Sequence, residues 1–156
     1  MAYWNWQRSY ELGISVIDNQ HKRLVQYINE LCAALTTKER RKIASVLAGI
    51  TEYTTLHFAF EERLMEEAGY EKIESHKKTH AAFVATINRY KKAFEEGYDI
   101  SGQLMAELQI WLTYHISNDD MDYRNCVKKI LANKTLRNIK DRAETKRKSW
   151  FKTLFG

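Results

Sequence analysis

Proline is absent from the 156-residue sequence, and glycine occurs only six times. A β-sandwich or β-barrel needs many tight turns, which draw on these two residues, so both architectures are disfavoured and long helices are favoured. No apolar run approaches the roughly 20 residues that a helix needs to cross a bilayer. Residues 1–4 lack the basic and apolar regions of a secretory signal peptide, so we expect a cytoplasmic protein.

Cysteine is equally scarce, with only Cys32 and Cys126 in the chain. Two cysteines cannot build a disulfide scaffold, and no neighbouring residue gives either of them the spacing of a metal site. We therefore expect two small thiols, buried or half-buried, in a reducing compartment.

The net charge of +5 is unevenly distributed along the chain. Residues 133–156 hold eight Lys or Arg and two Asp or Glu, a local charge of +6, which leaves 17 basic and 18 acidic residues, or −1, in residues 1–132. This contrast predicts a near-neutral domain over 1–132 and a basic amphipathic tail over 133–156. Because the tail alone makes the chain basic, the charge is poor evidence for nucleic-acid binding, which we do not expect.

Apolar residues recur at helical spacing in four segments, over residues 17–35, 43–64, 76–94 and 104–115. Thr36 or Thr37 is the expected N-cap of the second helix and Ser101 that of the fourth, whereas Gly69 is the expected C-cap of the second. Four helices of about 17 to 27 residues with short connections predict an all-α, antiparallel up-down-up-down four-helix bundle. An N-terminal arm with Trp4, Trp6 and Tyr10 is expected to pack against it.

All five histidines lie on these apolar stripes, and every helix carries at least one: His21, His57, His76, His80 and His115. A single histidine there is usually a hydrogen-bonded core residue, but five together are hard to explain in that way. Glu61 lies one turn after His57 on the same face, and a buried carboxylate requires compensating positive charge. Since no Lys or Arg lies on the stripes, a bound cation is the simplest source of that charge.

The spacing of these residues suits metal chelation. His57 with Glu61 and His76 with His80 are i, i+4 pairs, which place two side chains about 5–6 Å apart on one helix face. Imidazoles suit iron, zinc, copper or nickel, and five are too many for one tetrahedral zinc. Two metals joined by bridging carboxylates would use every donor. Asp120 can supply the second carboxylate if the chain leaves regular helix around residues 117–119, although periodicity leaves Asp119 and Asp122 open.

At this point the sequence resembles the hemerythrin family, in particular the bacteriohemerythrins. The resemblance rests on residues 13–22, 57–62, 76–80 and 111–116 together with Asp120, and it spans about residues 4–130. All seven ligand positions of the family are filled. The basic tail lies beyond the part that resembles the family.

The resemblance implies a non-haem di-iron centre and reversible dioxygen binding. His76, His80 and His115 would bind one iron, and His21 and His57 the other, with Glu61 and Asp120 bridging both. These ligands and one bridging oxygen fill all but one position of two octahedral ions. The open position, on the iron with two histidines, is where the family binds dioxygen and reduces it reversibly to hydroperoxide.

Five neutral imidazoles and two carboxylates favour reversible binding over the oxygen cleavage of carboxylate-rich di-iron oxidases. We therefore expect an oxygen-binding protein for storage, delivery or buffering, and not an enzyme. An oxygen or redox sensor that signals through the tail and a slow di-iron peroxidase or oxidase remain as alternatives. Candidates for an apolar pocket around dioxygen are Ile17, Leu24, Leu64, Trp111 and Leu112. A monomer is favoured over an oligomer.

The tail continues with apolar residues at helix-like spacing, and a break is expected near residues 146–148. Basic residues beside Trp, Phe and Leu are typical of a helix on an anionic membrane surface or of a segment that docks on an acidic protein. A helix folded back on the bundle is the alternative. If the tail binds an anionic membrane surface, we expect this cytoplasmic protein at the inner face of the membrane.

Overall fold

A computed structural model describes the backbone of residues 3–155 and the side chains of residues 3–149. The described chain is helical, without β-strands. Its elements are η1 (Arg8–Tyr10), α1 (Ser15–Thr37), α2 (Arg40–Ala68), α3 (Ile73–Glu95), α4 (Ser101–Tyr114), η2 (His115–Asp120) and α5 (Met121–Phe155).

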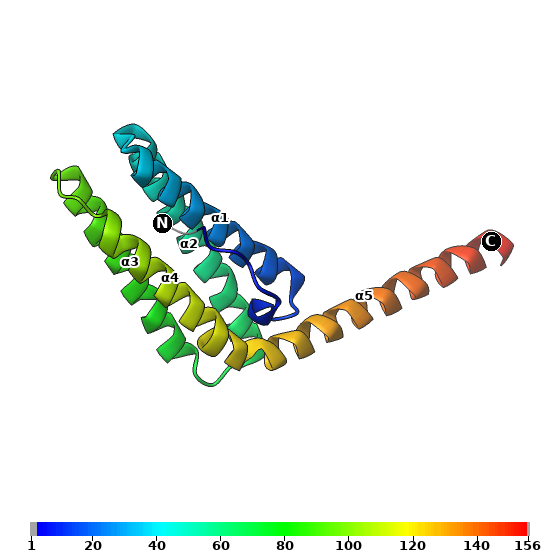
Figure 1. Ribbon diagram of the computed structural model, residues 1–156. Coiled ribbons are helices and arrows are strands. Elements are labelled where there is room, and N and C mark those ends of the chain that lie inside the picture. The colour runs from blue at the N-terminus through cyan, green and yellow to red at the C-terminus, as the bar shows by residue number, and fades with distance from the viewer. Residues whose placement is uncertain (1–2, 156) are drawn as a thin grey trace.

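Helices α1 to α4 form the predicted antiparallel up-down-up-down bundle (Figure 1). Short connections join them, and the apolar stripe of each helix faces the interior. Leu31, Leu47, Ile87 and Leu104 have at most 1% of their surface exposed. Burial of these stripes supplies the main stabilisation of the bundle, since isolated helices of this length are only marginally stable in water.

The ends of the helices differ in part from the expectation. Gly69 adopts a left-handed conformation and ends α2 as predicted, with φ of 64°. The predicted N-caps Thr36 and Thr37 are wrong, because their hydroxyls donate to carbonyls of the preceding turn, at 2.9 Å and 3.2 Å, and both residues belong to α1. Ser101 is likewise the first residue of α4, and the side chain of Asp99 accepts a hydrogen bond from its backbone nitrogen at 2.9 Å.

The N-terminal arm packs on the bundle as expected. The backbone nitrogen of Trp4 donates to Asn29 on α1 at 2.8 Å, and Asn29 returns a bond of 2.9 Å to the Trp4 carbonyl. The carboxylate of Asp18 accepts hydrogen bonds from the backbone of Leu12 at 2.7 Å and of Gly13 at 3.0 Å. These contacts hold the arm along α1, from its first turn to Asn29.

The chain leaves regular α-helix between α4 and α5, in the segment where the sequence suggested a bend. Residues His115–Asp120 form a π-helical turn, η2, which continues directly into α5. A π turn closes hydrogen bonds between residues five apart, so it brings residues at that spacing to the same side. His115 and Asp120 have this spacing.

Helix α5 extends away from the bundle (Figure 1). Its backbone is helical through residues 146–148, so the break predicted there is wrong. All side chains of residues 132–149 are exposed, which also rules out the alternative of a helix folded back on the bundle. Trp150 and Leu154, which the sequence placed on its apolar stripe, lie outside the described side chains. The division at residue 132 stays a prediction, since α5 crosses it without interruption.

Candidate metal centre

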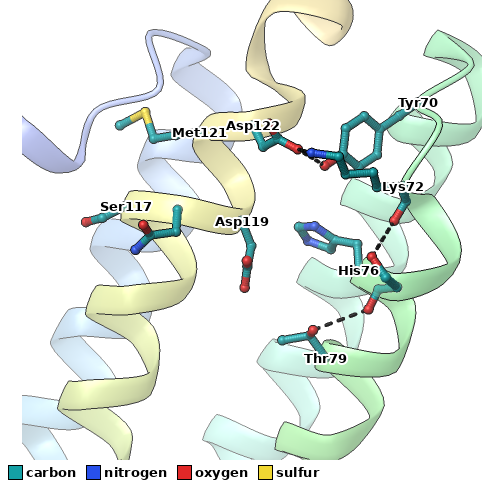
Figure 2. A pocket seen from close by; sticks show the side chains of 10 residues that line it. Tyr70, Lys72, His76, Thr79, Ser117, Asp119, Met121 and Asp122 are labelled. Carbon is teal, nitrogen blue, oxygen red and sulfur yellow. Dashed lines mark hydrogen bonds and ion pairs between the residues drawn. The ribbon is translucent and has the colours of Figure 1, made fainter.

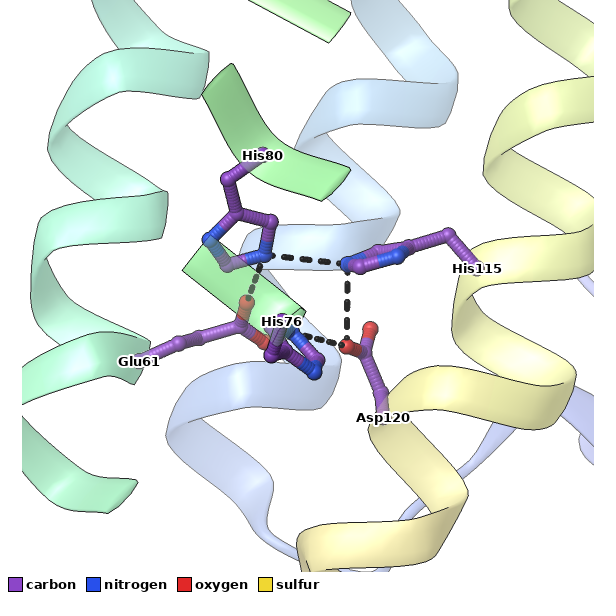
Figure 3. Close-up of side chains that lie close together, drawn as sticks. All are labelled: Glu61, His76, His80, His115 and Asp120. Carbon is purple, nitrogen blue, oxygen red and sulfur yellow. Dashed lines mark hydrogen bonds and ion pairs between the residues drawn. The ribbon is translucent and has the colours of Figure 1, made fainter. Parts of the chain in front are cut away.

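Seven buried side chains converge at the end of the bundle from which α5 departs. They are the five histidines and two acidic residues singled out in the sequence, and each has at most 3% of its surface exposed. Figure 3 shows Glu61, His76, His80, His115 and Asp120 of this cluster. Helix α1 contributes His21, α2 contributes His57 and Glu61, α3 contributes His76 and His80, and η2 contributes His115 and Asp120.

Helical geometry determines which of these side chains are neighbours. One turn of α2 places Nε2 of His57 at 3.5 Å from Oε1 of Glu61. One turn of α3 brings the rings of His76 and His80 to a centroid distance of 4.4 Å. The wide turn of η2 places Oδ1 of Asp120 at 3.1 Å from Nε2 of His115. Neither of the other acids that the sequence left open for this place, Asp119 and Asp122, belongs to the buried donor cluster.

The donors fall into two groups that could each hold a metal ion. One group consists of Glu61, His76, His80, His115 and Asp120, and the other of His21, His57 and Glu61. Within each group, one ligand atom of every residue lies within 4.8 Å of the others. Glu61 belongs to both groups.

Both buried carboxylates direct their two oxygens to different imidazoles. Oε1 of Glu61 lies 3.5 Å from Nε2 of His21, whereas Oε2 lies 3.5 Å from Nε2 of His80. Oδ2 of Asp120 lies 3.2 Å from His21, whereas Oδ1 lies 3.3 Å from His76. The geometry is that of two carboxylates that span two sites.

Polar side chains around the cluster orient three of the imidazoles. Nδ1 of His57 donates to Gln20 at 2.7 Å. Nδ1 of His80 donates to Glu62 at 2.8 Å, and Nδ1 of His115 donates to Asp119 at 2.9 Å. A proton on Nδ1 leaves the lone pair of a neutral imidazole on Nε2, which faces the cluster. Nε2 of His80 and Nε2 of His115 lie only 3.0 Å apart (Figure 3). Two such lone pairs repel each other unless a proton or a metal ion lies between them.

Unpaired polar atoms test whether the cluster fits a metal. Ten buried side-chain nitrogen or oxygen atoms of the described residues lack a hydrogen-bond partner, and eight of them belong to five of the seven cluster residues. An unpaired buried polar atom costs about 1–3 kcal/mol, so native proteins contain few of them. Metal coordination would satisfy most of these atoms at once. The donor set, rich in imidazole and without thiolate, fits iron and other transition metals.

The titration behaviour shows how the cluster balances its charge without a metal. Burial would lower the pKa of His21 and of His115, but the nearby carboxylates of Asp120 and Glu61 outweigh it and raise these pKa values to about 9 and about 10. Burial dominates at His57 and lowers its pKa to about 4. The surrounding imidazoles hold the pKa of Asp120 well below its usual range despite burial. Two imidazolium ions thus face two carboxylates.

The predicted pocket residues separate into two sets. Leu24, Trp111 and Leu112 line a small apolar cavity of about 10 Å³ together with Phe58 and Thr54. Ile17 and Leu64 are buried in the core but do not line this cavity. Leu24 and Thr54 lie three residues from His21 and His57, so the cavity lies about one helical turn from the two-imidazole group.

A second, polar pocket of about 520 Å³ lies on the other side of the cluster, between α3 and η2 (Figure 2). Tyr70 and Lys72 line it, and both donate to Asp122, at 2.6 Å and 2.8 Å. His76 and Asp119 also line it. The three-imidazole group is therefore close to a polar surface. The apolar cavity adjoins both groups, because its lining residues Phe58 and Trp111 stack on His80 and His115.

The sequence did not indicate the residues that orient the cluster. Gln20, Glu62 and Asp119 each adjoin a predicted ligand in the chain, and this adjacency was the available signal. Tyr123 on α5 also contacts the cluster. Its hydroxyl donates a 2.6 Å hydrogen bond to Oε1 of Glu61, and its side chain is completely buried.

Comparison with known proteins agrees with this geometry. The hemerythrin HHE cation-binding domain matches residues 12–126. A bacteriohemerythrin of Pseudomonas aeruginosa is 42% identical over 144 residues and 92% of each chain, and one of Stenotrophomonas maltophilia is 42% identical over 82% of this chain and 84% of its own. A crystal structure of wild-type hemerythrin superimposes with a TM-score of 0.76 at 26% identity, over 81% of this chain and 98% of that chain.

The Pseudomonas match corrects one expectation. A match of 144 residues in a chain of 156 cannot end near residue 130, so the similarity continues into the extension formed by α5. Hemerythrins are known for binding oxygen at a di-iron site. On the match of its domain, its curated relatives and its fold, the chain belongs to the hemerythrin family.

Proposed function

We propose that this chain binds dioxygen reversibly at a pair of iron ions held by His21, His57, Glu61, His76, His80, His115 and Asp120. The single observation that carries the proposal is the arrangement of the two carboxylates. Each of them has one oxygen near an imidazole of the first group and one near His21 of the second. Such carboxylates suit two ions better than one.

A pair of iron ions would supply the electrons for reversible binding of dioxygen. The chain contributes an asymmetric set of donors, with three imidazoles in one group and two in the other. The group with fewer protein donors adjoins the apolar cavity that Leu24 and Leu112 line. An apolar lining disfavours water, which needs two to four polar partners.

The surroundings favour a binding protein over an enzyme. Thr54 is the only residue with a hydroxyl among those that line the cavity, and no acidic or basic side chain lines it. General acid catalysis needs a titratable group within hydrogen-bond reach of the reacting atoms. The cavity side of the cluster offers none, which supports the carrier over the peroxidase or oxidase.

The test combines metal analysis with visible spectroscopy. We expect two irons per chain and a visible absorption in air that dithionite bleaches and oxygen restores. Asp120→Ala should lose at least one iron, because it removes a carboxylate whose two oxygens face His76 of the first group and His21 of the second. Asp122→Ala, which removes an exposed carboxylate two residues away, is the matched control and should keep both. One iron or none in the unaltered protein would contradict the proposal.

The rate of autoxidation separates the carrier from its alternatives. A carrier should keep its oxygenated form for minutes or longer after mixing with air. A redox sensor or a peroxidase should lose that form within seconds and consume oxygen or peroxide repeatedly. Rapid turnover would therefore replace the carrier by one of these two functions while leaving the metal assignment intact.

A further inference from the structure

The α5 extension, residues 133–149, presents an exposed surface that the bundle does not use. Lys134 forms an ion pair with Glu67 on α2, and beyond it α5 extends away from the bundle (Figure 1). Leu136 and Ile139 have 56% and 58% of their surface exposed. Exposed apolar side chains indicate an interaction site when they form one patch with polar residues around it.

These apolar residues share one line along the helix. At 3.6 residues per turn, Leu136, Ile139 and Ala143 fall on the same face, which we call the α5 stripe. The sequence repeats the spacing with Trp150 and Leu154, which lie beyond the described side chains. The stripe is narrow, so apolar contact alone would bind weakly.

The charged residues of the extension are sorted around the α5 stripe. Seven Lys or Arg and two Asp or Glu occur within residues 133–149. Four basic residues flank the stripe, two on each side: Arg142 and Lys146, and Lys140 and Arg147. Both acidic residues, Asp141 and Glu144, fall on the opposite half of the helix. The face that carries the apolar groups is therefore uniformly positive at its edges.

We propose that the α5 stripe and its flanking basic residues dock on the surface of a bilayer that contains anionic lipid. The stripe would enter the boundary between headgroups and acyl chains. The long side chains on its flanks reach lipid phosphates while their methylene groups stay in the apolar boundary. Binding to the surface is the membrane role open to α5, since no helix of the described chain is both long and apolar enough to span a bilayer.

A second copy of the chain is a poorer occupant of the stripe. It would bring two helices of the same strong positive charge side by side, and like charges at such a seam are destabilising. An acidic protein would satisfy the charges as well, but it would not require the acidic residues to be kept on the opposite half. A flat anionic surface explains both the stripe and the sorting.

Vesicle co-sedimentation of the full iron-loaded chain tests the proposal. We expect binding to vesicles of phosphatidylcholine with phosphatidylglycerol, no binding to phosphatidylcholine alone, and a loss of binding as salt increases. Leu136→Ser with Ile139→Ser should abolish binding. Circular dichroism and iron content, which should not change, establish that this variant remains folded.

Two matched double variants distinguish the effect of the basic residues beside the α5 stripe from the effect of the total charge of the extension. Arg142→Gln with Lys146→Gln removes two charges beside the stripe and should weaken binding about thirtyfold. Arg137→Gln with Lys148→Gln removes two charges from the far side and should weaken it much less. Equal losses from both pairs, or no binding to anionic vesicles at low salt, would overturn the proposal. Stronger binding to polyglutamate than to vesicles would replace the lipid surface by an acidic protein. None of these outcomes depends on oxygen binding.

Discussion

The hydroxyl of Tyr123 donates a 2.6 Å hydrogen bond to Oε1 of Glu61, and neither residue exposes any surface. The bond links α5 to α2 inside the cluster. Burial and the anionic neighbours Glu61 and Asp120 hold the pKa of Tyr123 well above its usual range, so the phenol keeps its proton at every ordinary pH. Tyr123 is therefore a permanent donor to a carboxylate that is shared by both metal groups.

Tyr123→Phe removes this donor while keeping the ring. Hydrogen bonds to charged groups contribute about 1.5–3 kcal/mol, and the free energy of unfolding of the metal-free protein should fall by about that amount. Urea denaturation followed by circular dichroism measures it. Tyr98→Phe, at an exposed position after α3, is the control and should have little effect. An unchanged midpoint for Tyr123→Phe would show that water or another donor replaces the phenol.

Glu62→Gln should weaken metal binding without removing a predicted ligand. Glu62 accepts the Nδ1 proton of His80 at 2.8 Å, and a carboxylate in that position raises the basicity of the imidazole. We expect metal affinity to fall about 10- to 100-fold, as measured by competition with a chelator. Glu66→Gln makes the same change one turn further along α2, where the carboxylate pairs with Lys77 at 2.5 Å on the surface. It should not alter the affinity.

Loading the cluster with metal should release protons. The pKa values of His21 and His115, about 9 and about 10, mean that both imidazoles are protonated in the metal-free protein at pH 7. A metal ion displaces such protons, so loading at this pH should release about two per chain. Calorimetric titration in buffers with different ionisation enthalpies counts them. A count near zero would show that the metal-free cluster is already neutral.

The stability of the metal-free protein should pass through a maximum near pH 6.5. His21 and His115 bind more protons folded than unfolded between pH 6.5 and about 9 to 10, so their contribution is lost as the pH rises through that range. His57, with a pKa of about 4, binds fewer protons folded than unfolded, so stability also falls as the pH drops below 6.5. Urea denaturation across this range measures both slopes. A free energy of unfolding that increases with pH above pH 7 would contradict the predicted contribution of His21 and His115.

Thr54→Val should stabilise the protein. Thr54 is 2% exposed and its hydroxyl has no hydrogen-bond partner among the residues that the structure describes, whereas Thr51 in the same helix donates to the Leu47 carbonyl at 2.8 Å. Valine has nearly the same shape, so the change removes an unpaired polar group from the cavity wall at a gain of about 1 kcal/mol. Thr51→Val should give no such gain. A lower denaturation midpoint for Thr54→Val would mean that the hydroxyl has found a partner.

The fold and most of the cluster could be predicted because both rest on helical spacing. The pairs His57 with Glu61 and His76 with His80 lie one turn apart in any α-helix, so the sequence determines their neighbours. Asp120 could not be chosen from periodicity because it follows a π turn, in which the spacing of residues on one side changes from four to five. The resemblance to known proteins, and not the pattern, singled it out.

Other features escaped the sequence for different physical reasons. Thr36 and Thr37 are residue types that often cap helices. Here their hydroxyls donate to backbone carbonyls of α1, and both residues form its last turn. The unbroken course of α5 was missed because an exposed helix has no core to impose a clear pattern. The partners of the imidazoles, such as Gln20, lie at the edge of the apolar stripes, where a polar residue usually faces solvent.

The π turn has a consequence for the orientation of the chain that follows it. If residues 115–120 formed ordinary α-helix at the same length, everything that follows would rotate by about 100°. Asp120 would then swing out of the cluster, and every side chain of α5 would turn by the same angle around its axis. The number of residues in this single turn therefore determines two orientations at once. It sets the direction of the Asp120 carboxylate and the direction in which the α5 stripe faces.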